Sequence, residues 1–144
     1  MIRAIIADDE PRARKLLHDM LTEAKTVEVV GAAGSGDEAL RLVRETRPDV
    51  IFLDVAMPGL SGVEVARAIG AGKIGVVFVT AYDQHALEAF EPGAVDYLLK
   101  PFDEARLREA LSRVQARASR TASEVAAVID SIPGRERAGE RNFL

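Results

Sequence analysis

The chain contains no cysteine and no tryptophan, and only two of its 144 residues are histidine. Without cysteine there can be no disulfide bond, no catalytic thiolate and no cysteine-bound zinc. Two histidines also argue against a histidine-rich metal site. The net charge of −4 argues against nucleic-acid binding by this segment itself.

Long apolar runs are missing as well. No run approaches the ~20 residues of a membrane-spanning helix, and no signal peptide precedes the first strand-like segment. We therefore expect a cytoplasmic protein that does not contact the membrane. Apolar residues make up 48% and charged residues 29% of the chain, which is ordinary for a globular protein. The length suits one domain with a single buried core.

Strand-like and helix-like patterns alternate along the chain. Five short apolar segments are typical of strands: residues 2–7, 27–33, 50–53, 75–79 and 95–99. A helical pattern follows each of them, beginning at Pro11, Ser35, Ser61, Asp83 and Asp103. This alternation predicts an α/β fold with a parallel sheet covered on both faces. We expect a flavodoxin-like, doubly wound, five-stranded sheet of order 2-1-3-4-5 with five helices.

The segment around Asp54 organises the rest of the prediction. Residues 50–53 are apolar and lie between Pro48 and Met57-Pro58-Gly59, as in a strand buried on both faces. Asp54 follows this run, so its carboxylate should emerge at the carboxyl edge of the sheet, where such folds bind ligands. A single aspartate after a strand is more often a turn former.

Other strands bring polar groups to the same edge. Four strand ends carry Asp8 with Asp9, Asp54, Thr80 and Lys100. Each has a structural explanation when taken alone: acidic residues suit a helix N-terminus, and a lysine before a proline suits a solvated turn. Their coincidence at four strand ends favours a shared site.

Phosphoryl chemistry fits these groups. Three carboxylates within ~5 Å would repel one another by ~10 kcal/mol in all at an effective dielectric constant of 20. A hard cation relieves such repulsion, and oxygen ligands indicate magnesium or manganese. Asp54 is the candidate nucleophile for an aspartyl phosphate, Lys100 would neutralise phosphoryl charge, and Thr80 would donate a hydrogen bond.

These residues resemble the receiver domain of two-component response regulators over residues 1–118. The resemblance rests on the following set: Asp8-Asp9, Asp54, Thr80, Lys100-Pro101, and the loop residues Met57-Pro58-Gly59 and Ser61-Gly62. Tyr97, three residues before Lys100, matches the aromatic residue that changes rotamer when such domains switch. The resemblance implies that Asp54 is the phosphoacceptor.

The resemblance also assigns the metal ligands. It implies that Asp9 and Asp54 bind the metal directly, together with the backbone carbonyl of Ala56. Asp8 would act mostly through water.

Three further residues receive roles by resemblance. The Lys100–Pro101 peptide bond is expected to be cis. Ala56 and Tyr82 flank the approach of water to the phosphoryl group in this family. Since Ala56 cannot orient water and Tyr82 could shield the group, we expect slow self-dephosphorylation.

Residues 80–90 and 94–102 are similar to the LytR/AlgR subgroup, whose receivers precede a LytTR-type DNA-binding domain. This similarity implies a sensor histidine kinase as partner and transcription regulation through an output domain. It also implies a homodimer through residues 83–90, 95–99 and the helix beginning at Asp103. The only chemistry expected is phosphorylation and dephosphorylation of the chain itself, so it is not an enzyme with an external substrate.

Residues 119–144 form a second segment. Thr121 and Glu124 have capping-box spacing, which predicts a short helix through Ile132 that is broken at Pro133-Gly134. The remainder would be a flexible linker towards an absent, DNA-binding output domain. Alternatively, the apolar residues of this segment extend the preceding helix.

Three other functions compete with a receiver domain. A phosphohydrolase working through aspartyl phosphate would need a carboxylate at Ala56 and a cap domain. A nucleotide- or flavin-binding module would need a G-x-G-x-x-G motif, which residues 31–36 do not fit. A phosphorylation-independent interaction module would have no need for the intact polar set.

Overall fold

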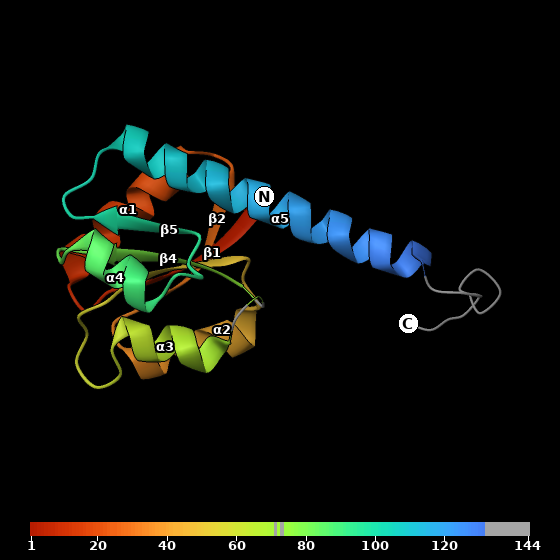
Figure 1. Ribbon diagram of the computed structural model, residues 1–144. Coiled ribbons are helices and arrows are strands. Elements are labelled where there is room, and N and C mark those ends of the chain that lie inside the picture. The colour runs from red at the N-terminus through yellow and green to blue at the C-terminus, as the bar shows by residue number, and fades with distance from the viewer. Residues whose placement is uncertain (71, 73, 132–144) are drawn as a thin grey trace.

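The computed structural model describes residues 1–70, 72 and 74–131. Its centre is a parallel sheet of order β2-β1-β3-β4-β5, so the predicted fold class and strand order are confirmed. The strands are β1 (Ile2–Ala7), β2 (Val27–Ala33), β3 (Val50–Asp54), β4 (Gly75–Thr80) and β5 (Asp96–Leu99). The helices are α1 (Pro11–Glu23), α2 (Gly36–Thr46), α3 (Gly62–Ile69), α4 (Gln84–Phe90) and α5 (Glu104–Ser131), and Figure 1 shows their arrangement.

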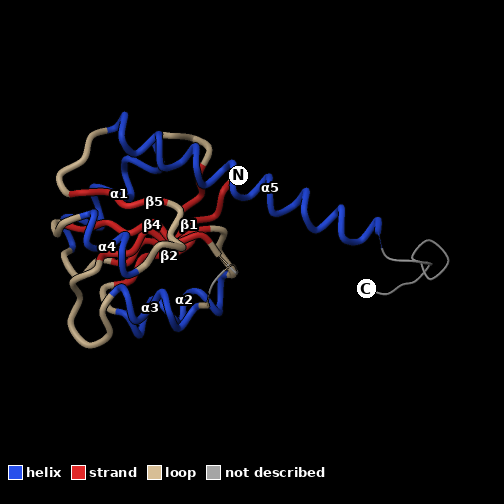
Figure 2. Tube along the Cα trace, in the orientation of Figure 1, coloured by secondary structure: helices blue, strands red, loops and turns tan. Residues whose placement is uncertain are grey.

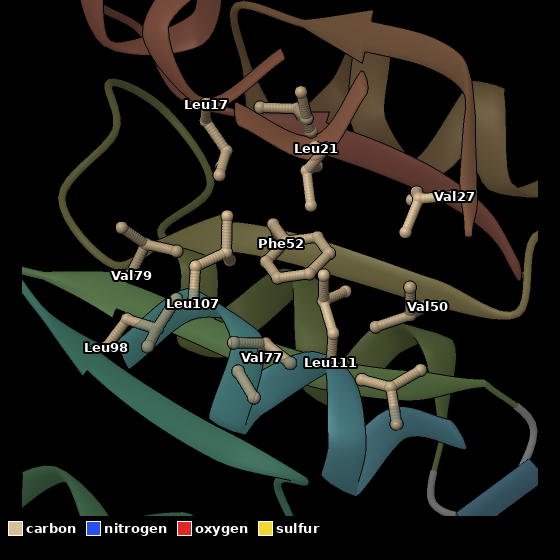
Figure 3. Close-up of a cluster of buried hydrophobic side chains, with 14 of the residues drawn as sticks. Leu17, Leu21, Val27, Val50, Phe52, Val77, Val79, Leu98, Leu107 and Leu111 are labelled. Atoms are coloured by element: carbon tan, nitrogen blue, oxygen red, sulfur yellow. The ribbon is translucent and has the colours of Figure 1, made fainter. Parts of the chain in front are cut away.

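Helices cover both faces of the sheet. Figure 2 shows the strands as a central layer between α1 and α5 on one side and α2 and α3 on the other. The side chains of β3 alternate between these two layers. Phe52 packs with Leu17 and Leu107 beneath α1 and α5 (Figure 3). Leu53 packs on the opposite face, so β3 is buried on both sides, as predicted.

Strand register aligns the carboxyl ends of the central strands. Ala7 pairs with Leu53, and Thr80 pairs with Leu99. Asp8, Asp54 and Lys100 directly follow residues of these pairs. They therefore lie at the same edge of the sheet as Thr80.

The last helix is longer than the receiver prediction required. It runs without a break from Glu104 to Ser131, so no separate helix begins at Thr121 and the alternative of an extended helix is the one observed. No glycine or proline occurs between residues 104 and 131 to end it. Figure 1 shows its second half projecting beyond the sheet. The predicted break at Pro133-Gly134 and the linker lie outside the described residues.

No helix within these described residues combines the length and apolar character required to cross a membrane.

Candidate functional site

The polar residues predicted to converge do so at the carboxyl edge of the sheet. Asp8 and Asp9 follow β1, and Asp54 ends β3. One carboxylate oxygen from each of these three residues lies within 4.8 Å of the others. Asp8 and Asp54 are buried, whereas Asp9 is exposed to solvent. The result is an acidic cluster that is open on one side.

Lys100 supplies positive charge to this cluster. Its Nζ donates a 2.8 Å hydrogen bond to Oδ2 of Asp8 and lies 3.6 Å from Oδ2 of Asp54. Burial alone would lower the pKa of Lys100, but the hydrogen bond with Asp8 and the charge of Asp54 raise it above its ordinary value. The backbone N–H of Lys100 donates to the carbonyl of Thr80, and the Lys100–Pro101 bond is cis. Lys100 is therefore a cation at neutral pH, shared between two carboxylates.

The pKa of Asp54 is raised above its ordinary value even though Lys100 lies beside it. Burial raises its pKa, and the neighbouring Asp8 adds to the effect, while Lys100 opposes it. The backbone N–H of Ala56 donates a 3.3 Å hydrogen bond to Oδ1 of Asp54. Because the cluster consists of carboxylates that are not fully compensated, its donor set fits a hard divalent cation such as Mg²⁺.

Thr80 and Tyr97 lie on the other side of Asp54. Thr80 is completely buried, and its Oγ1 accepts a 2.9 Å hydrogen bond from the N–H of Tyr82. Tyr97 is 7% exposed and stacks on Phe78, with ring centroids 6.0 Å apart. Its hydroxyl donates to the backbone carbonyl of Glu91 at the end of α4. Both hydroxyls therefore have partners other than Asp54 in this conformation.

Sequence reasoning missed a buried ion pair beside Tyr97. Asp96 is 3% exposed and receives hydrogen bonds of 2.9 and 2.8 Å from Nη1 and Nη2 of Arg106. Arg113 adds a second cation at 2.8 Å. Burial would raise the pKa of Asp96, but these hydrogen bonds from Arg106 hold it below its ordinary value. Oδ1 of Asp96 also accepts a hydrogen bond from the N–H of Tyr97, and Nη2 of Arg106 donates to the backbone carbonyl of Tyr97.

These hydrogen bonds fix the backbone of Tyr97, whereas the position of its ring depends on other contacts.

A second contact that the sequence did not predict joins α1 to the acidic cluster, where Arg14 donates a 2.7 Å hydrogen bond to the carbonyl of Asp8. No helix or strand periodicity signals either contact, because Asp96 and Asp8 lie outside the helices that carry Arg106 and Arg14.

Comparison with known proteins agrees with this geometry. The family model of the response regulator receiver domain matches residues 4–112. An uncharacterized response regulatory protein of Vibrio vulnificus (strain CMCP6) is 45% identical over 123 residues, which is 85% of this chain and 51% of that protein. The transcriptional regulatory protein BtsR of Escherichia coli (strain K12) is 44% identical over 121 residues, covering 83% of this chain and 51% of BtsR.

This chain thus spans about half the length of the curated relatives it matches. Among solved structures, the response regulator TrrA of Thermotoga maritima in complex with Mg²⁺ and BeF is 33% identical, with a TM-score of 0.71. That likeness covers 79% of this chain and 99% of the TrrA chain.

Proposed function

The chain belongs to the response regulator receiver domain family, and on this basis we propose that Asp54 accepts a phosphoryl group that switches the protein between two conformations. One observation carries the proposal: a buried Asp54 lies in a carboxylate cluster with Asp8 and Asp9, and Lys100 contacts it from the side. The phosphoryl donor would be a sensor histidine kinase or a small acyl phosphate.

The reaction is a displacement at phosphorus. An Oδ of Asp54 attacks the phosphorus atom of the donor, and a new O–P bond forms. The bond from phosphorus to the donor's histidine nitrogen or acyl oxygen breaks, and its electron pair leaves with the donor. Such a reaction needs positioning and charge neutralisation more than covalent assistance.

The residues of the cluster would also hold the metal. Asp9 and Asp54 would bind Mg²⁺ or Mn²⁺ directly, together with the backbone carbonyl of Ala56, and Asp8 would act through water. When bound, the cation supplies positive charge beside the transferred group. The related TrrA structure contains Mg²⁺ with BeF, which supports this assignment.

Lys100, Thr80 and Tyr97 would respond to the modified aspartate. The ammonium of Lys100 already lies against Asp54, so it can pair with a phosphoryl oxygen. The Thr80 hydroxyl would leave the N–H of Tyr82 and donate to the phosphoryl group. The ring of Tyr97 would then move into the space vacated by Thr80.

Phosphoryl uptake from acetyl phosphate tests this function. Incubation with acetyl phosphate and Mg²⁺ should add one phosphoryl group to the intact chain, as measured by mass spectrometry, and chelation of the metal should prevent the addition. A chain that stays unmodified under both conditions would contradict the proposal.

The lifetime of the phosphoryl group is expected to be long. Ala56 is exposed two residues after Asp54, and its side chain has no polar atom that could orient water. Tyr82, two residues after Thr80, is 61% exposed. An Ala56→Asn substitution should shorten the lifetime by about tenfold, because an amide can hold the attacking water. Release of phosphate after removal of the donor measures it, and an unchanged lifetime would count against a role for Ala56.

We also propose that α4, β5 and α5 form a homodimer face. Phe90 at the end of α4 is 74% exposed and Leu99 at the end of β5 is 46% exposed. Large exposed apolar side chains are typical of interaction surfaces. An isologous two-fold dimer is the default symmetry for such a face.

Light scattering after size exclusion tests the dimer. Beryllofluoride with Mg²⁺, a mimic of the phosphoryl group, should shift the chain from monomer to dimer. Phe90→Ser should weaken the dimer by about tenfold or more, as expected for an aromatic anchor. Leu16→Ser is the matched control, since Leu16 is 62% exposed on α1, outside the proposed face. Equal dimerisation of both variants would exclude this face.

Transcription regulation remains part of the proposal. BtsR is a transcriptional regulatory protein, and this chain covers about half of it. We therefore propose that the phosphorylated receiver acts on an output domain of the LytTR type, which would contact DNA.

A further inference from the structure

Tyr97 is held in place through a chain of contacts that reaches α3. Its hydroxyl donates to the backbone carbonyl of Glu91. The Glu91 carboxylate in turn accepts hydrogen bonds of 2.7 and 3.1 Å from Nη2 and Nε of Arg67. The Glu91 side chain is only 15% exposed, whereas that of Arg67 is 63% exposed. A single glutamate therefore connects α3 to the hydroxyl of Tyr97.

Apolar burial contributes little to holding α4 in place. The helix spans Gln84–Phe90 and buries only Leu87. A helix of two turns has marginal stability without tertiary contacts. Arg67 and Glu91 also line an open surface pocket of about 350 Å³, together with Ala66, Phe78 and Ala94. Because α4 buries only one side chain, the Arg67–Glu91 pair is a direct polar link between α3 and the end of α4.

We propose that the Arg67–Glu91 ion pair is a latch that keeps Tyr97 in its resting position. To move towards Thr80, the Tyr97 hydroxyl must leave the Glu91 carbonyl. Arg67 keeps that carbonyl in position, and so it stabilises the resting conformation relative to the switched one. The inference rests on the proposed phosphorylation switch and adds a residue on α3 that sets its threshold.

The expected effect is moderate because the arginine is partly exposed. Loss of the pair should lower the beryllofluoride concentration at the midpoint of switching by roughly two- to fivefold. Phosphoryl uptake at Asp54 should persist, because neither Arg67 nor Glu91 belongs to the acidic cluster.

Fluorine NMR of the full chain labelled with 3-fluorotyrosine measures the switch directly. The chain contains two tyrosines, so two signals are expected, and Tyr82→Phe assigns them. The Tyr97 signal would be followed during titration with beryllofluoride in the presence of Mg²⁺. Arg67→Ala and Glu91→Gln should both lower the midpoint. Arg41→Ala is the control, since it removes an arginine whose ion pair with Glu45 lies within the single helix α2.

The double variant separates a latch from two independent effects. If Arg67 and Glu91 act as a pair, Arg67→Ala/Glu91→Gln should shift the midpoint no further than either single change. Additive shifts, or single variants that match the parent, would overturn the latch while leaving the switch intact. A parent chain whose Tyr97 signal ignores beryllofluoride would overturn the latch together with the proposed function.

Discussion

Replacing Asp54 with asparagine is expected to abolish phosphoryl uptake from acetyl phosphate. Asparagine keeps the shape of the side chain but lacks the carboxylate oxygen that attacks phosphorus. Asp54 is buried at the end of the central strand β3, and the ammonium of Lys100 lies 3.6 Å from its Oδ2. The intact mass of the variant should therefore remain that of the unmodified chain after incubation with Mg²⁺ and acetyl phosphate.

A matched control separates the role of Asp54 from general loss of charge. Asp37 is an exposed aspartate in the first turn of α2, away from the acidic cluster. Asp37→Asn removes the same charge and should be phosphorylated like the parent chain. Uptake by Asp54→Asn at the parent rate would remove Asp54 from the role of phosphoacceptor.

Gly62→Ala is expected to destabilise the fold strongly. A Cβ at Gly62 would lie 2.2 Å from the carbonyl oxygen of Asp54 and 2.9 Å from Cα of Val55. Both are backbone atoms, so neither can rotate away, and the Gly62 N–H also donates to the carbonyl of Val55. We expect a loss of about 3 kcal/mol or more in the free energy of unfolding.

Urea denaturation measures this loss, with Gly93→Ala as the control. A Cβ at Gly93 would meet no atom within 4 Å, so that variant should unfold close to the parent midpoint. If Gly62→Ala were as stable as the parent, the close approach of α3 to the end of β3 would be wrong. Such a result would also undermine the position assigned to Asp54.

Most of the site followed from the sequence because strand ends are easy to locate. The apolar runs fix where β1, β3 and β4 stop, and a parallel sheet brings those ends together. Asp8, Asp54 and their neighbours could therefore be placed without knowledge of any side-chain contact.

The contacts around Tyr97 could not be predicted in this way. Asp96 pairs with Arg106 across two elements, and Arg67 pairs with Glu91 across another two. Charged residues are common on helix surfaces, and the choice of partner depends on how helices pack, which periodicity does not specify. The length of α5 was left open for a related reason, since capping-box spacing at Thr121 also suits a helix interior.

Calorimetric titration with Mg²⁺ tests the central claim most directly, because the cluster should bind the cation before any phosphoryl group arrives. The parent chain should show saturable uptake of one ion, and Asp9→Asn should weaken it by about tenfold or more, since it removes one charged ligand. Asp9 is exposed, so this variant should remain folded. Absence of Mg²⁺ uptake by the parent, or undiminished uptake by Asp9→Asn, would contradict a metal site built from these strand ends.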